Sequence, residues 1–196
     1  MDSSGHHVWS RCFGGEGERT FGPEVAVAPD GSIFLVGTLF TVLDFAVPSS
    51  AAMVGAGALR TEGEGDIYVV KLTEDGEFEW QRRFGDAESQ DTRIGVVATE
   101  DRSVILAGTT RGKIDLDSGG SLPGDPNGMP FFLELDDTGH VRWGAPLGAS
   151  AYMTAYDAVA LGDCNTFYFA ADYHGDLTAR SEFGGTSGLV VGRFAR

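Results

Sequence analysis

Three stretches of this chain repeat one another, and the repetition limits the folds open to it. Trp9, Trp80 and Trp143 each follow a glycine by four residues, and they are spaced by 71 and 63 residues. A β-rich run recurs with the same two spacings, and an aspartate before Phe or Leu follows it in every copy, at Asp44, Asp115 and Asp176. Since these landmarks keep one phase, the chain contains three diverged copies of one unit.

Each copy predicts four short strands. In the first full copy these are residues 25–28, 33–38 and 67–72 and the segment around Trp80, separated by turns rich in Asp and Gly. The first two runs are apolar nearly throughout, whereas the fourth alternates. We therefore expect the first two strands to be buried on both faces and the fourth to meet water. Two sequential antiparallel hairpins per unit predict an all-β fold of β-propeller blades, three four-stranded antiparallel repeats in a partial propeller or in half of an assembled ring.

The repeat also predicts the organisation of the chain. Residues 1–196 form a single β-propeller region, with blades at about 24–84, 95–146 and 157–196. Residues 7–13 match a fourth strand, and the third copy ends after its third strand, so residues 7–13 are the candidate closing strand. Three blades are too few to close a ring. Two possibilities stay open: a fragment of a larger propeller, or a homodimer that completes a six-bladed ring.

Charge and composition exclude several classes of function. The 14 Lys and Arg against 29 Asp and Glu give a formal net charge of −15, which repels phosphate backbones, so we expect no nucleic-acid partner. We expect no membrane span, because no run approaches the roughly 18 apolar residues that one needs. The chain also shows no signal-peptide pattern. Cys12 and Cys164 allow at most one disulfide, and their redox state stays open.

Loops that join the fourth strand of one blade to the first strand of the next are candidates for ligand binding, because propellers commonly bind at that face. Asp86 and Asp91 could serve glycosidic chemistry, although paired acids are common in exposed loops of an acidic protein. Tyr152 and Tyr156 beside Asp157 could stack on a sugar or pack at the loop base. The full set of candidate ligand-binding residues is Arg19, Asp86, Asp91, Arg93, Tyr152, Tyr156 and Asp157. No catalytic residue is assigned.

A calcium site is a further expectation. Asp115, Asp117, Asp125 and Asn127 offer oxygen ligands of the kind that calcium prefers. The segment lacks the spacing and the terminal glutamate of an EF-hand loop, so a plain Gly/Asp turn is the alternative. The four histidines show no zinc-ligand spacing with Cys or Glu, and no other cofactor is expected.

The repeated motif resembles that of a known family. The pattern Gly-x-x-x-Trp-x-x-x-Phe-Gly runs from Gly5 to Gly14 and from Gly76 to Gly85, and a third, weaker copy has Leu147 in place of Phe. Together with the strand Asp66-Ile67-Tyr68-Val69-Val70-Lys71-Leu72, it resembles the SBBP-type bacterial β-propeller repeat over nearly all of the chain. The resemblance implies a propeller fold and a secreted or cell-surface setting. It carries over no catalytic residue.

Taken together, these features favour a non-catalytic β-propeller repeat module that acts as a binding or interaction scaffold for a protein or glycan, at the bacterial cell surface or outside the cell. A carbohydrate-binding, lectin-like propeller is the first alternative, and several equivalent pockets between blades would indicate it. A glycan hydrolase or lyase is the second, and a deep acidic pocket with carboxylates of raised pKa would indicate that.

Overall fold

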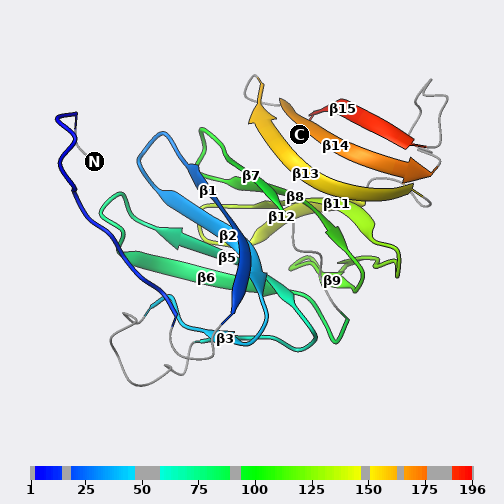
Figure 1. Ribbon diagram of the computed structural model, residues 1–196, viewed down its shortest axis with the longest axis horizontal. Helices are drawn as coiled ribbons and strands as arrows, with labels where there is room; N and C mark the ends of the chain where they lie inside the picture. The colour runs from blue at the N-terminus through cyan, green and yellow to red at the C-terminus, as the bar shows by residue number, and fades with distance from the viewer. Residues whose placement is uncertain are drawn as a thin grey trace.

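The computed structural model describes residues 3–14, 19–46, 58–88, 94–146, 151–162, 166–175 and 187–195. Over these ranges the chain is all-β, with no helix and with several antiparallel sheets (Figure 1). No helix long and apolar enough to cross a membrane is therefore found in the described part of the chain.

Three sheets follow one another along the chain. The first has the order β1-β2-β5-β6, and the second, with the order β7-β8-β11-β12, repeats its topology. The third contains three strands among the described residues, in the order β13-β14-β15. The strands of the first sheet are β1 (Thr20–Val27), β2 (Ile33–Leu39), β5 (Asp66–Leu72) and β6 (Phe78–Phe84). Those of the second and third are β7 (Gly95–Ala98), β8 (Val104–Thr110), β11 (Met129–Leu135), β12 (Val141–Pro146), β13 (Ala151–Leu161), β14 (Thr166–Gly175) and β15 (Ser187–Ala195).

A short hairpin interrupts each of the first two sheets between its second and third strands. These hairpins pair β3 (Val42–Leu43) with β4 (Leu59–Arg60) and β9 (Ile114–Asp115) with β10 (Ser121–Leu122). They fold back along the outer strand of their sheet, because β4 contacts β6 and β10 contacts β12. The predicted strands thus all appear in the first two sheets, most of them within a few residues of the expected bounds.

The tight turns follow from local chemistry. In the turn between β1 and β2, the Asp30 carboxylate accepts the amide of Ser32 at 3.0 Å, and Gly31 has a φ of +89°. In the turn between β11 and β12, Asp136 accepts the amide of Thr138 at 2.8 Å, and Gly139 has a φ of +84°. An aspartate that bonds its own backbone and a glycine with positive φ are what such turns require.

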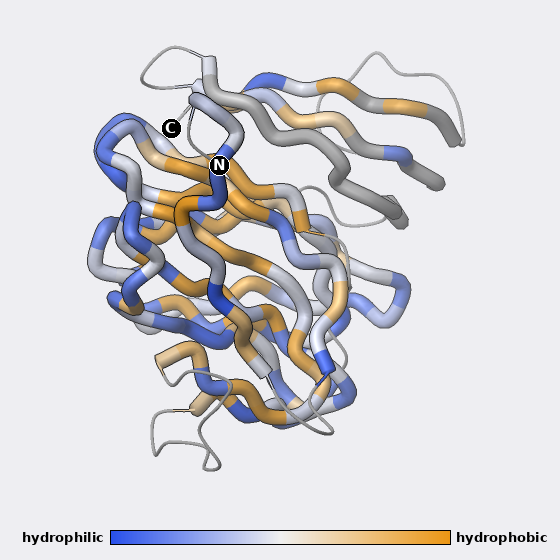
Figure 2. The backbone as a smooth tube through the Cα atoms, turned by 60° about the vertical axis from the view of Figure 1, so that its left-hand side comes forward, coloured by the Kyte–Doolittle hydropathy of each residue, from blue (hydrophilic) through white to orange (hydrophobic). Residues whose placement is uncertain are grey.

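The sheets stack in one repeated way. In the first sheet we call the face that carries Phe34 and Val36 face A, and the opposite face, which carries Ile33 and Leu35, face B. In the other two sheets, faces A and B are those that carry the equivalent residues of the repeat. Face A of the first sheet packs on face B of the second in one buried cluster that joins Phe34 and Val36 to Leu106, Phe131 and Leu133. In Figure 2 the hydrophobic colour lies mainly along these strands, and the hydrophilic colour mainly along the turns.

Face A of the second sheet packs in the same way on face B of the third. The ring of Phe132 lies 5.0 Å from Phe167, 5.2 Å from Phe169 and 4.8 Å from Phe194, measured between centroids. Trp143 stacks on Phe167 at 6.2 Å. The predicted packing of Trp80 and Trp143 between sheets is confirmed, since Trp80 also borders the cluster between the first two sheets.

Two expectations about the strands are wrong. First, one part of the burial expectation is wrong. The second strands, β2 and β8, are mostly or fully buried and the fourth strands, β6 and β12, are partly exposed, as expected. The first strand, β1, is however mostly exposed. The reason is that β1 is an edge strand of a sheet whose face B is open along that strand, so Val25 and Val27 meet water.

Second, residues 6–14 form no strand. A strand needs a neighbour to pair with, and the predicted neighbour of this segment is the last strand of the third copy, β15. The segment lies against the first sheet, and Figure 1 shows it on the opposite side of the molecule from β15. The closing role of residues 7–13 therefore stays a prediction.

The turn glycines give a test of the stacking. A Cβ at Gly139 would lie 3.1 Å from the Trp80 ring, whereas a Cβ at Gly119, which also has a positive φ of +87°, would meet nothing within 4 Å. We expect Gly119→Ala to lower the free energy of unfolding by about 1 kcal/mol through backbone strain alone. Gly139→Ala should cost at least about 1 kcal/mol more, because the indole must also shift. Urea unfolding measures both, and equal losses would contradict the packing role of Trp80.

Candidate functional site

Two of the predicted ligand residues lie at what we call the loop end, where residues 61–65, 85–88 and 111–113 meet. The Asp86 carboxylate accepts hydrogen bonds from the backbone amides of Glu88, at 3.0 Å, and Lys113, at 2.8 Å. It therefore connects the link after β6 to the segment before β9. The guanidinium of Arg19 lies 5.4 Å from the centroid of the Phe40 ring. Asp91 and Arg93 lie outside the described residues, so the proposed pair of Asp86 with Asp91 stays a prediction.

The other three predicted ligand residues are not in a loop. Tyr152, Tyr156 and Asp157 belong to β13, which begins at Ala151, whereas the sequence predicts a strand only from residue 158. In the register of the third sheet, Tyr152 pairs with His174 and Tyr156 with Ala171. Their placement in a loop is therefore wrong, because β14 is long enough to pair with the whole of 151–161. Their side chains lie outside the described part of the structure, and their role stays a prediction.

The predicted calcium ligands Asp115, Asp117, Asp125 and Asn127 make contacts within the chain, and the calcium site itself stays a prediction. Among the described residues there is no group of three or more His, Cys, Asp or Glu side chains that could hold a metal ion. Asp115 pairs with Lys113 at 2.7 Å, and Asp125 accepts the amide of Asn127 at 2.8 Å within its own turn. Asp117 binds an arginine, as described below. These contacts favour the alternative of plain turns for this segment.

A groove that the sequence did not indicate lies between residues 9–13 and the first sheet. It has a volume of about 520 Å³, and residues 75–78 and the start of the link after β3 form its other wall. The Trp9 indole donates to the carbonyl of Glu74 at 3.0 Å, Arg11 pairs with Glu77, and the Phe13 ring lies 5.2 Å from Phe45. Cys12, an exposed free thiol, also lines it.

The contacts that form this groove match those at the interface between the first two sheets. There, the Trp80 indole donates to the carbonyl of Asp137 at 2.8 Å, which matches the contact of Trp9 with Glu74. Trp80 lies over Gly139 as Trp9 lies over Gly76. Residues 9–13 thus hold the same place on face B of the first sheet that β6 holds on face B of the second, although they form no strand.

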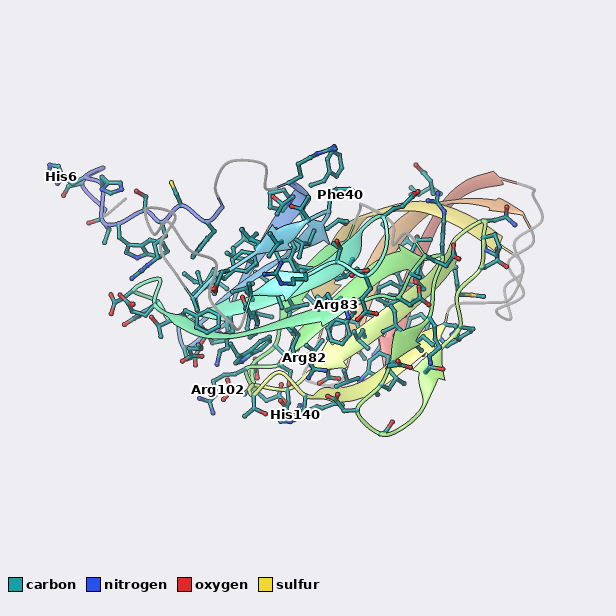
Figure 3. All side chains as sticks on the ribbon, turned by 90° about the horizontal axis from the view of Figure 1, so that it is seen from below. His6, Phe40, Arg82, Arg83, Arg102 and His140 are labelled. Atoms are coloured by element: carbon teal, nitrogen blue, oxygen red, sulfur yellow. The ribbon has the colours of Figure 1, made fainter. Side chains whose placement is uncertain are left out.

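One substitution distinguishes the two interfaces. Asp117 holds Arg82 with both carboxylate oxygens, at 2.9 and 3.1 Å, and accepts the amide of Val141 at 2.7 Å. Figure 3 shows Arg82 beside the turn that carries His140. The position of Asp117 in the repeat is Ala46 in the first copy, which cannot bind Arg11. Comparing residues 46 and 117 in the aligned copies is the signal that would have found the groove.

Charged side chains also lie at the edges of the stacked sheets. Lys71 is 4% exposed and binds Glu79 at 2.8 Å and Asp137 in the next sheet. Burial by itself would lower the pKa of Lys71, but the hydrogen bonds to Asp137 and Glu79 outweigh it and raise that pKa. At the loop end, Asp66 is fully buried and binds Arg83 at 2.7 Å. Burial raises the pKa of Asp66, against the opposing contacts of the Glu62 amide and Arg83.

Comparison with protein-family models gives no match, and comparison with curated proteins gives no relative. The resemblance to the SBBP-type repeat therefore stays a prediction from the residues quoted above.

The pair of Arg82 with Asp117 predicts a pH dependence. The hydrogen bonds from Arg82 lower the pKa of Asp117, so its stabilising effect is present above the ordinary aspartate pKa near 4 and is lost as the pH falls through the lowered value. We expect Asp117→Asn to destabilise the protein by about 1 kcal/mol at pH 7, since the pair is partly exposed, and by less at pH 3.

Urea unfolding at pH 7, 5 and 3 measures this difference. Asp115→Asn is the control, because Asp115 pairs with Lys113 on the exposed surface, where ion pairs contribute little. A loss that stays the same from pH 7 to pH 3 would contradict the role of the Asp117 charge.

Proposed function

We propose that this chain is a non-catalytic β-propeller repeat module that acts as an interaction scaffold at the bacterial cell surface or outside the cell. The repeated stacking of face A on face B carries the proposal. The first strands support it as well, because β1 contacts β7 and β7 contacts β13. In a propeller the first strands of successive blades lie side by side around the central channel.

The loop end is the proposed interaction surface. In each of the first two sheets the tight turns lie at one end, which we call the turn end, and the longer links lie at the other. Rigid sheets that hold longer links at one end are the common arrangement of binding scaffolds. Contacts across the loop end stiffen it: Arg83 binds Asp66 and Glu62, and Asp86 accepts the amide of Lys113.

The two alternatives have less support from the described contacts. A lectin with equivalent pockets between blades would repeat the groove, but Arg82 and Asp117 fill the equivalent position between the first two sheets. An acid/base enzyme needs a carboxylate of raised pKa that substrate can reach. Asp66 has a raised pKa but is fully buried against Arg83, and Asp86 binds two backbone amides.

Site-specific photo-crosslinking in the cells that produce this chain tests the scaffold. A benzophenone amino acid would replace Glu64 at the loop end or, as matched control, Glu100 at the turn end; both glutamates are exposed. We expect a crosslinked species of defined mass from position 64 and none from position 100, because only the loop end carries the longer links. Equal yields at the two positions would contradict the loop end as the interaction surface.

Two further assays on the purified chain test the alternatives of a lectin and of a glycan hydrolase or lyase. Binding of the purified chain to a panel of immobilised oligosaccharides would favour the lectin. Release of reducing sugar from soluble polysaccharides would overturn the non-catalytic assignment.

A further inference from the structure

The stack of sheets has an open face at each of its two sides. On face A of the third sheet, Leu189 and Val191 of β15 are 67% and 62% exposed, and Tyr168 is 41% exposed. On face B of the first sheet, Val25 and Val27 are 60% and 61% exposed. Face A of one sheet packs on face B of the next at both interfaces inside the chain. The two open faces, face A of the third sheet and face B of the first, are therefore of the two kinds that pack together.

The third sheet also has an edge, along β15, that no strand pairs with in the part of the chain that the structure describes. In the first two sheets the strand that carries Trp80 or Trp143 pairs with the third strand of the sheet, with Lys71 opposite Trp80 and Glu134 opposite Trp143. Among the described residues, β15 pairs with β14 alone. Its residue at the position of Lys71 and Glu134 is Arg193, which lies opposite Tyr168 as Lys71 lies opposite Phe34.

Residues 9–13 hold the place of a fourth strand but form no strand, and they lack a third strand to pair with among the described residues. Trp9 and Phe13 contact face B of the first sheet as a fourth strand of a preceding sheet would, yet no third strand pairs with them. They cannot pair with β15 of their own chain, because the first sheet, on which they lie, and the third sheet are at opposite sides of the stack (Figure 1).

We propose that two copies of this chain close a six-sheet ring. Face A of the third sheet of each copy stacks on face B of the first sheet of the other, and residues 7–13 of each copy pair with β15 of the other. The proposal rests on the propeller arrangement proposed above. Two copies supply six sheets, within the usual four to eight blades of a propeller, whereas three copies would supply nine. A head-to-tail contact of this kind must close to give a defined assembly.

Charges at the new interface match those at an existing one. Lys71 of the first sheet binds Asp137 in the turn of the second sheet. By the repeat, Arg193 of one copy lies opposite Glu74 of the other, so a cation again meets a carboxylate. Pairing with β15 also places the exposed Val8 and Trp9 against a neighbouring strand and covers the edge of β15, a kind of edge that proteins seldom leave open.

The first measurement is the mass of the 196-residue chain by light scattering over a range of concentrations. We expect about twice the monomer mass of 20.7 kDa. Leu189→Glu should weaken the dimer by at least about tenfold in dissociation constant, because it places a charge on a face that the second copy buries. Ser118→Glu adds the same charge at an exposed site outside the proposed interface and should leave the dimer unchanged.

A cysteine pair tests the register. By the repeat, Cys12 faces Val190 of the other copy, as Arg83 faces Tyr68 within the first sheet. In a Cys164→Ser background, Val190→Cys should give a disulfide-linked dimer under mild oxidation. Val191→Cys is the control, since neighbouring residues of a strand point to opposite faces, and it should give little linkage.

Four outcomes would overturn the proposal: a monomer at all concentrations, a trimer or larger assembly, a disulfide between residues 12 and 190 within one chain, or a dimer that neither Leu189→Glu nor the cysteine pair affects. Circular dichroism and thermal unfolding check that the variants fold. A failure here leaves the interaction scaffold standing, because crosslinking at the loop end tests that separately.

Discussion

The packing of one sheet face on the next is the interaction on which the rest of this structure depends. A four-stranded meander has two apolar faces and cannot bury either by itself, so each sheet of this chain is stable only when a neighbour covers it. The buried Phe34, Phe131 and Phe132 supply much of that contact, and burying a side chain of this size contributes about 1.5 to 3 kcal/mol. The tryptophans fix the alignment of the sheets, because Trp80 both packs against the turn of the next sheet and donates a hydrogen bond to it.

Charged residues also link neighbouring sheets. Lys71 and Arg82 belong to the first sheet, and both reach carboxylates that lie in or beside the second. These pairs bind one sheet to the next at the edge of an apolar interface, so removing one partner leaves the other poorly compensated. Ala46 has no carboxylate for Arg11, and the groove beside residues 9–13 is the result. The pair of Arg82 with Asp117 thus fills the interface between the first two sheets, whereas the related interface between residues 9–13 and the first sheet contains the groove.

The two proposals concern different surfaces of the same array. The interaction scaffold uses the loop end, where contacts among Arg83, Asp66 and Glu62 stiffen the links. The ring of two copies uses the open faces and the edge of β15, which lie at the sides of the stack. A closed ring would hold two loop ends in one fixed arrangement, and a scaffold with two such surfaces binds a repeated partner more tightly than a single one does.

The sequence by itself determined the repeat, the all-β class and most strand positions, because the spacing of Trp9, Trp80 and Trp143 and the Asp-Gly turns act locally. It also indicated that Trp80 and Trp143 pack between sheets, whereas the same prediction for Trp9 is not met, because Trp9 contacts the first sheet alone among the described residues. It could not determine which segments pair as neighbouring strands or which faces another sheet buries. Residues 7–13 have the pattern of a strand but pair with no strand within the ranges that the structure describes. β13 extends through Tyr152 and Tyr156 because β14 pairs with it, and β1 is exposed because no described element covers its face. Pairing, burial and the groove depend on neighbours that are distant in the sequence, and only the tertiary structure sets those neighbours.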